Sequence, residues 1–322
     1  MHIIRNLSEL GERQQPAVVT VGNFDGVHLA HQRLFQSVVE SARRLNAVAT
    51  AVTFDPHPTR ILAPERTPKL LTTLEQKTRL IERQGIERLV VLPFTRELSE
   101  LTPQEFVRQV LVEGLGVVSV HVGENFRFGH RHAGDVQLLA ELACAMHFQL
   151  EVLSVLEARG ERVSSSRIRQ LLSEGRVGRA GRLLGRSYSV GGAIVHGSGV
   201  GKTQTVPTLN LAPVDEQLPK DGVYVTRTRL GEAWHESVSN VGHKPTFGEH
   251  RLTVESFLLD FGGELHATEM DVEFLYRLRD EVKFPDAGAL KAQIQKDVRR
   301  AANFFRLLKL LKRRSAQSVA PR

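Results

Sequence analysis

The chain has 322 residues, of which 41% are hydrophobic and 25% charged, the ordinary mix of a globular protein with about two domains. Its single cysteine, Cys144, excludes an internal disulfide and a cysteine-based zinc site, so we expect a reducing, cytoplasmic location. No segment approaches the roughly 18 consecutive apolar residues that a membrane span needs. The first fifteen residues also lack the apolar core of a signal peptide, and we expect a soluble protein without membrane partners.

The net charge of +7 is concentrated at the carboxyl end. Six basic residues and no acidic residue occur within 306–322, so the rest of the chain is nearly neutral. A basic helix end of this kind is typical of a solubilising surface or of a helix whose dipole it complements. The composition therefore disfavours a nucleic-acid partner, and it leaves homo-oligomerisation open.

The first half of the chain alternates short β-rich runs with helical patterns. Strands are predicted at 17–24, 48–54, 88–94, 117–123 and 148–156, and helices near 31–45, 73–84, 102–113 and 135–147. The strands are apolar on both faces, which favours a parallel sheet covered by helices on each side. The prediction is a doubly wound, Rossmann-like α/β domain, with its chemistry in the loops after Phe24, Phe54 and Gly123.

The second half changes character after two short helical patterns at 165–174 and 177–184. Closely spaced strands without intervening helices predict an antiparallel barrel or sandwich. These strands are expected at 188–196, 208–212, 222–230, 233–241, 253–260 and 269–277, followed by an amphipathic helix over about 286–311. The predicted domains are 1–184 and 185–308, with a basic tail over 309–322.

The segment VGNFDGVHLAH, residues 21–31, falls where the first strand gives way to a helix. Gly22 and Gly26 let the backbone approach a ligand, and His28 and His31 lie three residues apart at the helix start. Backbone N–H groups, the helix dipole and two imidazole donors together predict a polyphosphate site. The simpler alternative is that the histidines only cap the helix.

Four motifs resemble, in order, the amino-terminal module of bacterial bifunctional riboflavin kinase/FAD synthetases. They are VGNFDGVHLAHQRL (21–34), VTFDPHP (52–58), VGENFRFG with AGD (122–129 and 133–135) and VSSSRIRQLL (163–172). The first is also similar to the HxGH signature of nucleotidyltransferases related to class I aminoacyl-tRNA synthetases. Two positions depart from the family: Ala30 replaces a glycine, and Ser166 replaces a threonine while keeping the hydroxyl.

This resemblance implies transfer of the adenylyl group of ATP, a reaction that needs phosphate-stabilising donors more than a protein nucleophile. His28 and His31 would then be catalytic, within an ATP-binding turn formed by Gly22, Asn23, Phe24 and Asp25. A second phosphate clamp would consist of Ser164, Ser165, Ser166 and Arg169, although serines that cap a helix beside a surface arginine are the simpler alternative. Flavin or ATP contacts are assigned to Asp55, His57, Asn125 and Asp135; for Asp55 and Asn125, turn formation is an equal alternative.

The segment HGSGVGKT, residues 196–203, fails the P-loop pattern because His196 stands where the first glycine is required. Its place among antiparallel strands also argues against a P-loop kinase, although glycine-rich backbone can still bind phosphate. Downstream, Thr208 and Asn210 are two residues apart and so share one side of a strand. Their hydroxyl and amide oxygens suit Mg²⁺ shared with ATP phosphates.

Residues 185–305 resemble the flavokinase module of the same family through GVY (222–224), NVGHKPTF (240–247) and TVESFLLDF (253–261). This implies that Glu255 is the general base for the ribityl 5′-hydroxyl. The alternative is that Glu255 only lies on a solvent-exposed face of its strand. The resemblance also implies an ATP-binding loop with Gly197, Gly199, Gly201 and Lys202, joined by Thr208 and Asn210, and flavin contacts at Asn240 and Thr246. Thr205, Val206 and Phe257 depart from the family pattern.

The sequence thus predicts an enzyme that phosphorylates riboflavin to FMN and adenylylates FMN to FAD, with ATP and Mg²⁺. One alternative retains only the adenylyl transfer, with the barrel as a regulatory flavin-binding module. A more distant alternative is an RNA-binding protein, which the neutral body and the 6% aromatic content disfavour.

Overall fold

The protein is described from a computed structural model that covers residues 1–6, 9, 15–195, 208–246, 249–259, 261 and 266–318. The chain forms two compact units, Met1–Ser165 and Ser166–Arg322, which are described separately. This division groups the two short helices after residue 165 with the second unit. The predicted functional boundary at residue 184 stays a prediction.

The first unit contains a six-stranded, fully parallel sheet in the order β1-β4-β3-β2-β5-β6. Its strands are β1 (His2–Ile4), β2 (Ala17–Val21), β3 (Val48–Asp55), β4 (Arg88–Pro93), β5 (Val117–Gly123) and β6 (Gln149–Leu153). All five residues of β2 are buried, as expected for a central strand covered on both faces. The doubly wound fold is confirmed, and β1 is an edge strand that was not predicted.

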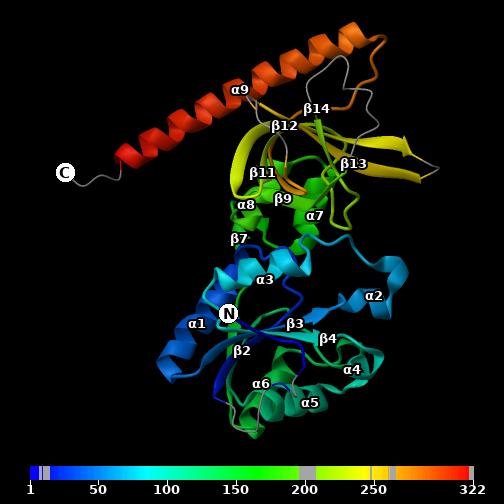
Figure 1. The fold of residues 1–322 in the computed structure, drawn as a ribbon. Helices are drawn as coiled ribbons and strands as arrows, with labels where there is room; N and C mark the ends of the chain where they lie inside the picture. The colour runs from blue at the N-terminus through cyan, green and yellow to red at the C-terminus, as the bar shows by residue number, and fades with distance from the viewer. Residues whose placement is uncertain are drawn as a thin grey trace. The chain divides into compact units, whose positions relative to one another are not determined.

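Helices cover both faces of this sheet (Figure 1). They are α1 (Leu29–Leu45), α2 (Pro58–Leu62), α3 (Leu74–Glu82), α4 (Arg96–Glu100), α5 (Pro103–Phe106), the π-helical segment η3 (Val107–Glu113) and α6 (Val136–Ala145). Side chains of α1 and α3 form one hydrophobic cluster with the sheet, and side chains of α5, η3 and α6 form another. A capping box formed by Thr102 and Glu105 begins α5.

The second unit begins with helices α7 (Ser165–Ser173) and α8 (Val177–Leu184), followed by a closed antiparallel barrel in the order β10-β13-β12-β11-β14-β9. The barrel strands are β9 (Tyr188–Val195), β10 (Thr208–Leu211), β11 (Gly222–Leu230), β12 (Ala233–Thr246), β13 (Glu249–Leu258) and β14 (Glu269–Arg279). A sandwich is thereby excluded in favour of the barrel. Strand closure also pairs β9 with both β10 and β14.

Hydroxyl side chains occupy part of the barrel interior. Thr226 lies 2.8 Å from Ser237 and 2.7 Å from Ser239 (Oγ to Oγ), and Ser239 lies 2.6 Å from Ser256. All four residues are fully buried. Because every one of these hydroxyls has a partner, the polar interior does not carry the cost of unsatisfied buried groups.

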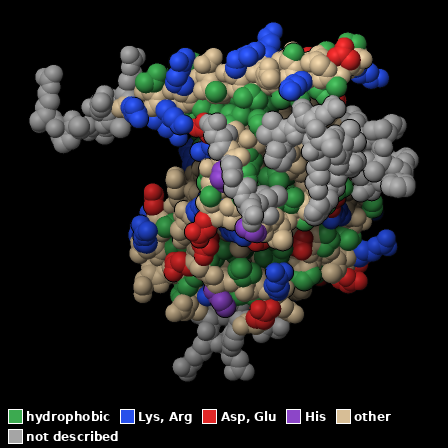
Figure 2. Space-filling model, turned by 45° about the horizontal axis from the view of Figure 1, so that its top comes forward, with side chains coloured by type: hydrophobic (Ala, Val, Ile, Leu, Met, Phe, Trp, Pro, Cys, Tyr) green, Lys and Arg blue, Asp and Glu red, His purple; other side chains and the backbone are tan. Residues whose placement is uncertain are grey.

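Helix α9 (Ala287–Ser318) closes the second unit, packing Ala301 and Phe305 on Val223, Val225 and Val238 of the barrel. An ion pair of 2.9 Å between Arg279 of β14 and the buried Asp297 also holds it. Figure 2 shows hydrophobic side chains beneath the helix and Lys and Arg side chains along it. The helix was predicted to end near residue 311 and a tail to begin at 309; instead, the helical backbone continues through Ser318.

Candidate functional site

A cavity of about 240 Å³ lies at the carboxyl ends of β2, β5 and β6 in the first unit. It is lined by Gly22, His28 and His31 from the β2 side and by Asn125 after β5, with Ser164 also on its wall. Strand order reverses direction between β2 and β5, because β3 and β4 lie to one side of β2 and β6 lies beyond β5. Ligands of doubly wound sheets bind at this reversal point, so the predicted phosphate motif is in the expected place.

The two histidines are stacked, with ring centroids 3.6 Å apart and planes 17° apart. His28 is the N-cap of α1, where its Nδ1 accepts a hydrogen bond of 3.4 Å from the backbone N–H of His31. The capping alternative is therefore true of His28, yet both rings also line the cavity. Burial, and then the neighbouring charges of His28 and Lys77, hold the pKa of His31 well below its usual value.

The turn between β2 and α1 has an unusual backbone. Phe24, Gly26 and Val27 all have positive φ angles, of 46°, 83° and 42°, and a β-branched residue rarely adopts this conformation. Hydrogen bonds stabilise it: Gly26 N–H donates to Thr72 Oγ1 at 3.1 Å, and Gln32 Nε2 donates to the Val27 carbonyl at 2.9 Å. The strained turn sets the direction in which α1 presents its histidines.

The carboxylate of Asp25, which was predicted to belong to the ATP-binding turn, is engaged by backbone groups of the protein. This carboxylate is only 2% exposed and accepts hydrogen bonds from the backbone N–H groups of Leu71 and Thr72, at 2.9 to 3.2 Å. A buried carboxylate already engaged by backbone donors is poorly placed to meet a phosphate, which it would also repel. Asp25 joins the turn between β2 and α1 (residues 22–28, here called the histidine turn) to the segment that leads into α3.

The serine motif is connected to the same turn. Ser165 Oγ donates a hydrogen bond of 2.9 Å to the carbonyl of Asp25, and Ser164 lies on the cavity wall. Ser166 and Arg169 are on α7 in the second unit. Their predicted contact with phosphate stays a prediction.

Three other predicted contacts lie at element ends. Asp55 is the exposed last residue of β3, and His57 is the N-cap of α2, its Nδ1 accepting from Thr59 N at 3.3 Å. Asp135 is the N-cap of α6 and pairs with Arg127 at 3.0 Å. The carboxylate of Asp135 thus caps the helix and forms an ion pair, and its predicted ligand contact stays a prediction.

Two cationic side chains of the cavity, Arg33 and Arg162, were not among the predicted site residues. Both are neighbours of predicted motifs, since Arg33 follows the histidines on α1 and Arg162 precedes the serines. Their place beside these motifs was the available sequence signal for a role in the site. The signal is weak, because a surface arginine belongs to no hydrophobic pattern that would set it apart from other arginines.

In the second unit, strand register brings the predicted kinase residues together. On three adjacent strands, Glu255 of β13 lies opposite Asn210 of β10 and opposite Asn240 of β12. Thr208, two residues before Asn210, lies on the same side of β10 and opposite Phe257. One surface of the barrel therefore presents a hydroxyl, two amides and a carboxylate as neighbours.

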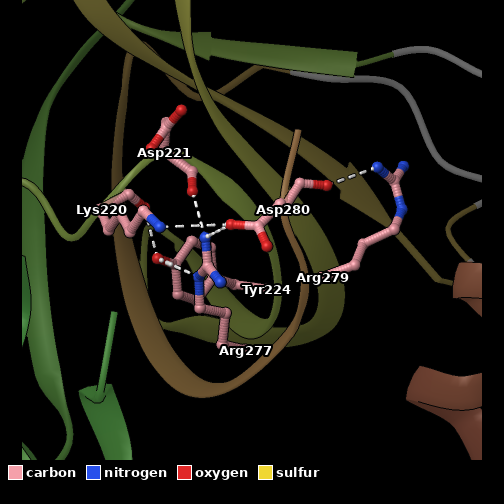
Figure 3. A network of polar contacts seen from close by, with 6 residues as sticks. All are labelled: Lys220, Asp221, Tyr224, Arg277, Arg279 and Asp280. Atoms are coloured by element: carbon pink, nitrogen blue, oxygen red, sulfur yellow. Dashed lines mark hydrogen bonds and ion pairs between the residues drawn. The ribbon is translucent and has the colours of Figure 1, made fainter. Parts of the chain in front are cut away.

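A polar network lies where the chain enters β11 and leaves β14 (Figure 3). Arg277 donates to the Asp221 carbonyl at 2.5 Å and to Asp280 at 2.8 Å, while the Tyr224 hydroxyl donates to the Lys220 carbonyl. These contacts fix the chain where it leaves β14. The next residue, Glu281, accepts a hydrogen bond of 3.4 Å from Asn240 Nδ2, which orients that amide beside Glu255.

A second cavity, of about 390 Å³, continues from the same barrel surface. Phe257 and Leu259, which follow Glu255 at alternate positions of β13 and just beyond it, form one wall. Val298 and Ala302 of α9 form the other, and its polar residues are Glu236, Arg306 and Lys309. Lys309 Nζ pairs with Glu236 at 2.7 Å, so part of the predicted basic tail belongs to the folded unit.

Several predicted kinase residues lie outside the described part of the chain: Gly197, Gly199, Gly201, Lys202, Thr205 and Val206. Thr246 ends β12, and only its backbone is described.

Comparison with known proteins agrees with the two modules that the sequence resembles. The family model for FAD synthetase matches residues 10–167, and the family model for riboflavin kinase matches residues 184–305. The bifunctional riboflavin kinase/FMN adenylyltransferase of Escherichia coli K12 is 34% identical over 311 residues, covering 96% of this chain and 99% of that protein. The protein of the same name from Pseudomonas fluorescens is 34% identical over 300 residues, covering 92% and 96%. The chain belongs to the bifunctional riboflavin kinase/FMN adenylyltransferase family.

Among solved structures, a crystal structure of a macrolide-efflux protein from Streptococcus pneumoniae is similar over 94% of this chain and 98% of that one. The TM-score is 0.84 at 28% sequence identity. Within the residues that the structure describes, no helix is long and apolar enough to cross a membrane.

Proposed function

We propose that the chain carries out two successive ATP-dependent reactions, one in each unit. The barrel transfers the γ-phosphoryl group of ATP to riboflavin, forming FMN and ADP. The α/β unit transfers the adenylyl group of a second ATP to FMN, forming FAD and pyrophosphate. The observation that carries the proposal is that each unit brings together its own group of donors: the stacked histidines at the β2/β5 reversal point, and the Asn210, Glu255 and Asn240 row on the barrel.

In the adenylyltransferase, a phosphate oxygen of FMN attacks the α-phosphorus of ATP, and the bond to the β-phosphate oxygen breaks. No proton has to be removed from the attacking oxygen, so the protein mainly stabilises charge on the phosphates. Because Nδ1 of His28 accepts the cap hydrogen bond, its Nε2 is the nitrogen that carries the proton and can donate to a phosphate. His31, Arg33 and Arg162 supply further donors at the same cavity.

In the kinase, the ribityl 5′-hydroxyl attacks the γ-phosphorus, its proton passes to Glu255, and ADP leaves. Thr208 and Asn210 offer hard hydroxyl and amide oxygens beside this carboxylate, a donor set that fits Mg²⁺. We assign these two residues as protein ligands of the Mg²⁺ that accompanies ATP. When bound, the ion would neutralise charge on the transferring group.

We assign the cavity beside Glu255 to the flavin ring. It is apolar on two walls, as a planar ring system requires. Asn240 would orient the ribityl chain, because it is the neighbour of Glu255 across the β12/β13 pair.

Product chromatography tests this function. The purified chain, incubated with ATP and Mg²⁺, is expected to form FMN and then FAD from riboflavin, and FAD from supplied FMN. Formation of FAD from FMN alone would reduce the barrel to a regulatory flavin-binding module. Absence of product from either substrate would refute both activities.

A further inference from the structure

A lysine occupies a core-facing position of helix α3. Leu74, Lys77 and Ile81 follow one another at helical spacing, and Lys77 is only 8% exposed. A residue with this spacing and burial is normally apolar. A charged group in its place needs a reason, because burying an ammonium is costly unless it is paired.

The described residues offer the Lys77 ammonium no contacting partner. Within the described ranges of the chain, its ammonium forms neither an ion pair nor a hydrogen bond. Burial lowers the pKa of Lys77, and Asp25 and Asp55 act from a distance in the opposite direction. By contrast, Lys220 and Lys309, both largely exposed, each contact a carboxylate. Of these three lysines, the buried Lys77 is the one without a contacting anion.

The surroundings of Lys77 place it at the histidine turn. The segment just before α3 holds this turn through Asp25 and Thr72, and the backbone N–H of Lys77 donates to the Thr73 carbonyl at 2.9 Å. Its charge also reaches His31, whose pKa it lowers. The neighbours of Lys77 thus come from the turn after β2 and from the end of β3, where Asp55 lies.

This is the opposite side of β2 from the cavity. The cavity is bounded by the ends of β2, β5 and β6, and Lys77 is not among its lining residues. The charges that act on Lys77 belong to Asp25, in the turn after β2, and to Asp55, at the end of β3. In the sheet, β3 lies on the opposite side of β2 from β5. Charge that develops on reacting phosphates is stabilised by cationic groups aimed at it.

We propose that the Lys77 ammonium binds a phosphate oxygen of ATP or of FMN in the amino-terminal site. This inference rests on the proposed adenylyltransferase function and adds a binding residue on the β3 side of the histidine turn. A phosphate supplies the contacting anion that the buried lysine lacks, and the lysine supplies a point charge suited to phosphate.

The test compares Lys77→Met with Arg79→Met in the full chain. Arg79 is on the same helix but exposed, where it pairs with Glu75, so its variant controls for removal of a positive charge. FAD formation is measured with ATP and FMN varied in turn. Lys77→Met is expected to raise the KM of one substrate by about 10- to 100-fold, and Arg79→Met to leave both KM values unchanged. A rise for ATP assigns the lysine to the nucleotide phosphates, and a rise for FMN assigns it to the flavin phosphate.

A melting temperature separates this role from a structural one. Because methionine removes an unpaired buried charge at similar volume, Lys77→Met is expected to melt no lower than the parent chain. If Lys77→Met fails to fold, Lys77→Gln, which keeps a polar group without the charge, takes its place. Unchanged KM values, with FAD still formed, would overturn the proposal, as would a lowered melting temperature without a KM change. A parent chain that makes no FAD would instead refute the proposed function, before any variant is compared.

Discussion

At the scale of single residues, the histidine turn requires a glycine at position 22. A Cβ added to Gly22 would lie 2.8 Å from the ring of Phe24. That ring is 2% exposed and packs against Phe35 at 4.8 Å and His31 at 5.3 Å between centroids. The ring cannot move away without displacing His31, so the requirement for glycine here is steric.

Gly22→Ala is therefore expected to destabilise the first unit by about 1–3 kcal/mol and to reduce FAD formation more than FMN formation. Gly123→Ala is the matched control for stability, because its Cβ would meet no atom within 4 Å. Urea unfolding together with both activity assays measures the difference. Equal stability of the two variants would contradict the steric account.

A buried histidine predicts the pH dependence of stability. His121 of β5 is fully buried, with its Nδ1 2.8 Å from Ser37 Oγ and 3.7 Å from Glu151. Burial lowers the pKa of His121 despite the opposing effect of Glu151. Below about pH 6.5, the pKa of an ordinary histidine, the unfolded chain takes up a proton that the native protein resists. The stabilising contribution is therefore complete above this pH and is lost as the pH falls.

His121→Asn removes this titration and keeps a polar atom near the position of Nδ1. Its free energy of unfolding is expected to fall less steeply between pH 7 and pH 5 than that of the parent chain. Denaturant unfolding at several pH values gives both slopes. If the free energies of unfolding of the variant and of the parent chain fall equally with pH, then the pKa of His121 does not differ between the folded and unfolded states.

At the scale of elements, α9 contributes to the cavity that we assign to the flavin ring. Its Val298 and Ala302 form one wall of that cavity, and its Phe305, 3% exposed, anchors the helix to the barrel. Under the proposed function, the helix is therefore part of the kinase site. Removing its anchor should disturb catalysis in the barrel as well as stability.

Phe305→Ala is expected to destabilise the second unit by about 3–5 kcal/mol and to abolish FMN formation at temperatures where FAD formation from supplied FMN persists. Leu311→Ala on the same helix, where Leu311 is 63% exposed, should change stability by no more than about 0.5 kcal/mol. Thermal melts and the two activity assays test this pair. Similar melting temperatures would mean that α9 is not anchored by Phe305.

Helices and strands could be predicted from the sequence where a local hydrophobic pattern marks them. Strands such as 117–123 and helices such as 177–184 were predicted with their observed bounds, because apolar runs and periodicity mark them clearly. The short edge strand β1 and the single-turn helix α2 carry too few residues for a periodic signal. A charged tail was predicted in place of the last turns of α9, because basic residues are concentrated there.

The sites were predictable where motif spacing was short. His28, His31, Thr208 and Asn210 stand in motifs whose members lie within four residues of one another, whereas the position of Glu255 opposite Asn210 depends on strand register that the sequence does not show. Lys77 was missed because its meaning depends on burial, which a lysine in a helix does not reveal. The roles of Asp25 and Asp135 depended on distant or capping backbone donors that sequence does not show.

At the scale of the whole molecule, the chain is two compact units, each with its own core and its own site. The product of the barrel reaction is the substrate of the other unit. Separate sites predict that each activity can be removed without the other, since no predicted catalytic residue is shared between the units.

The most direct measurement is therefore product analysis of two variants in the full chain with ATP and Mg²⁺. Glu255→Gln is expected to lower FMN formation from riboflavin by at least about 100-fold while leaving FAD formation from supplied FMN intact. His31→Ala is expected to lower FAD formation by about 100-fold or more while leaving FMN formation intact. Loss of both activities in either folded variant would contradict the assignment of one reaction to each unit.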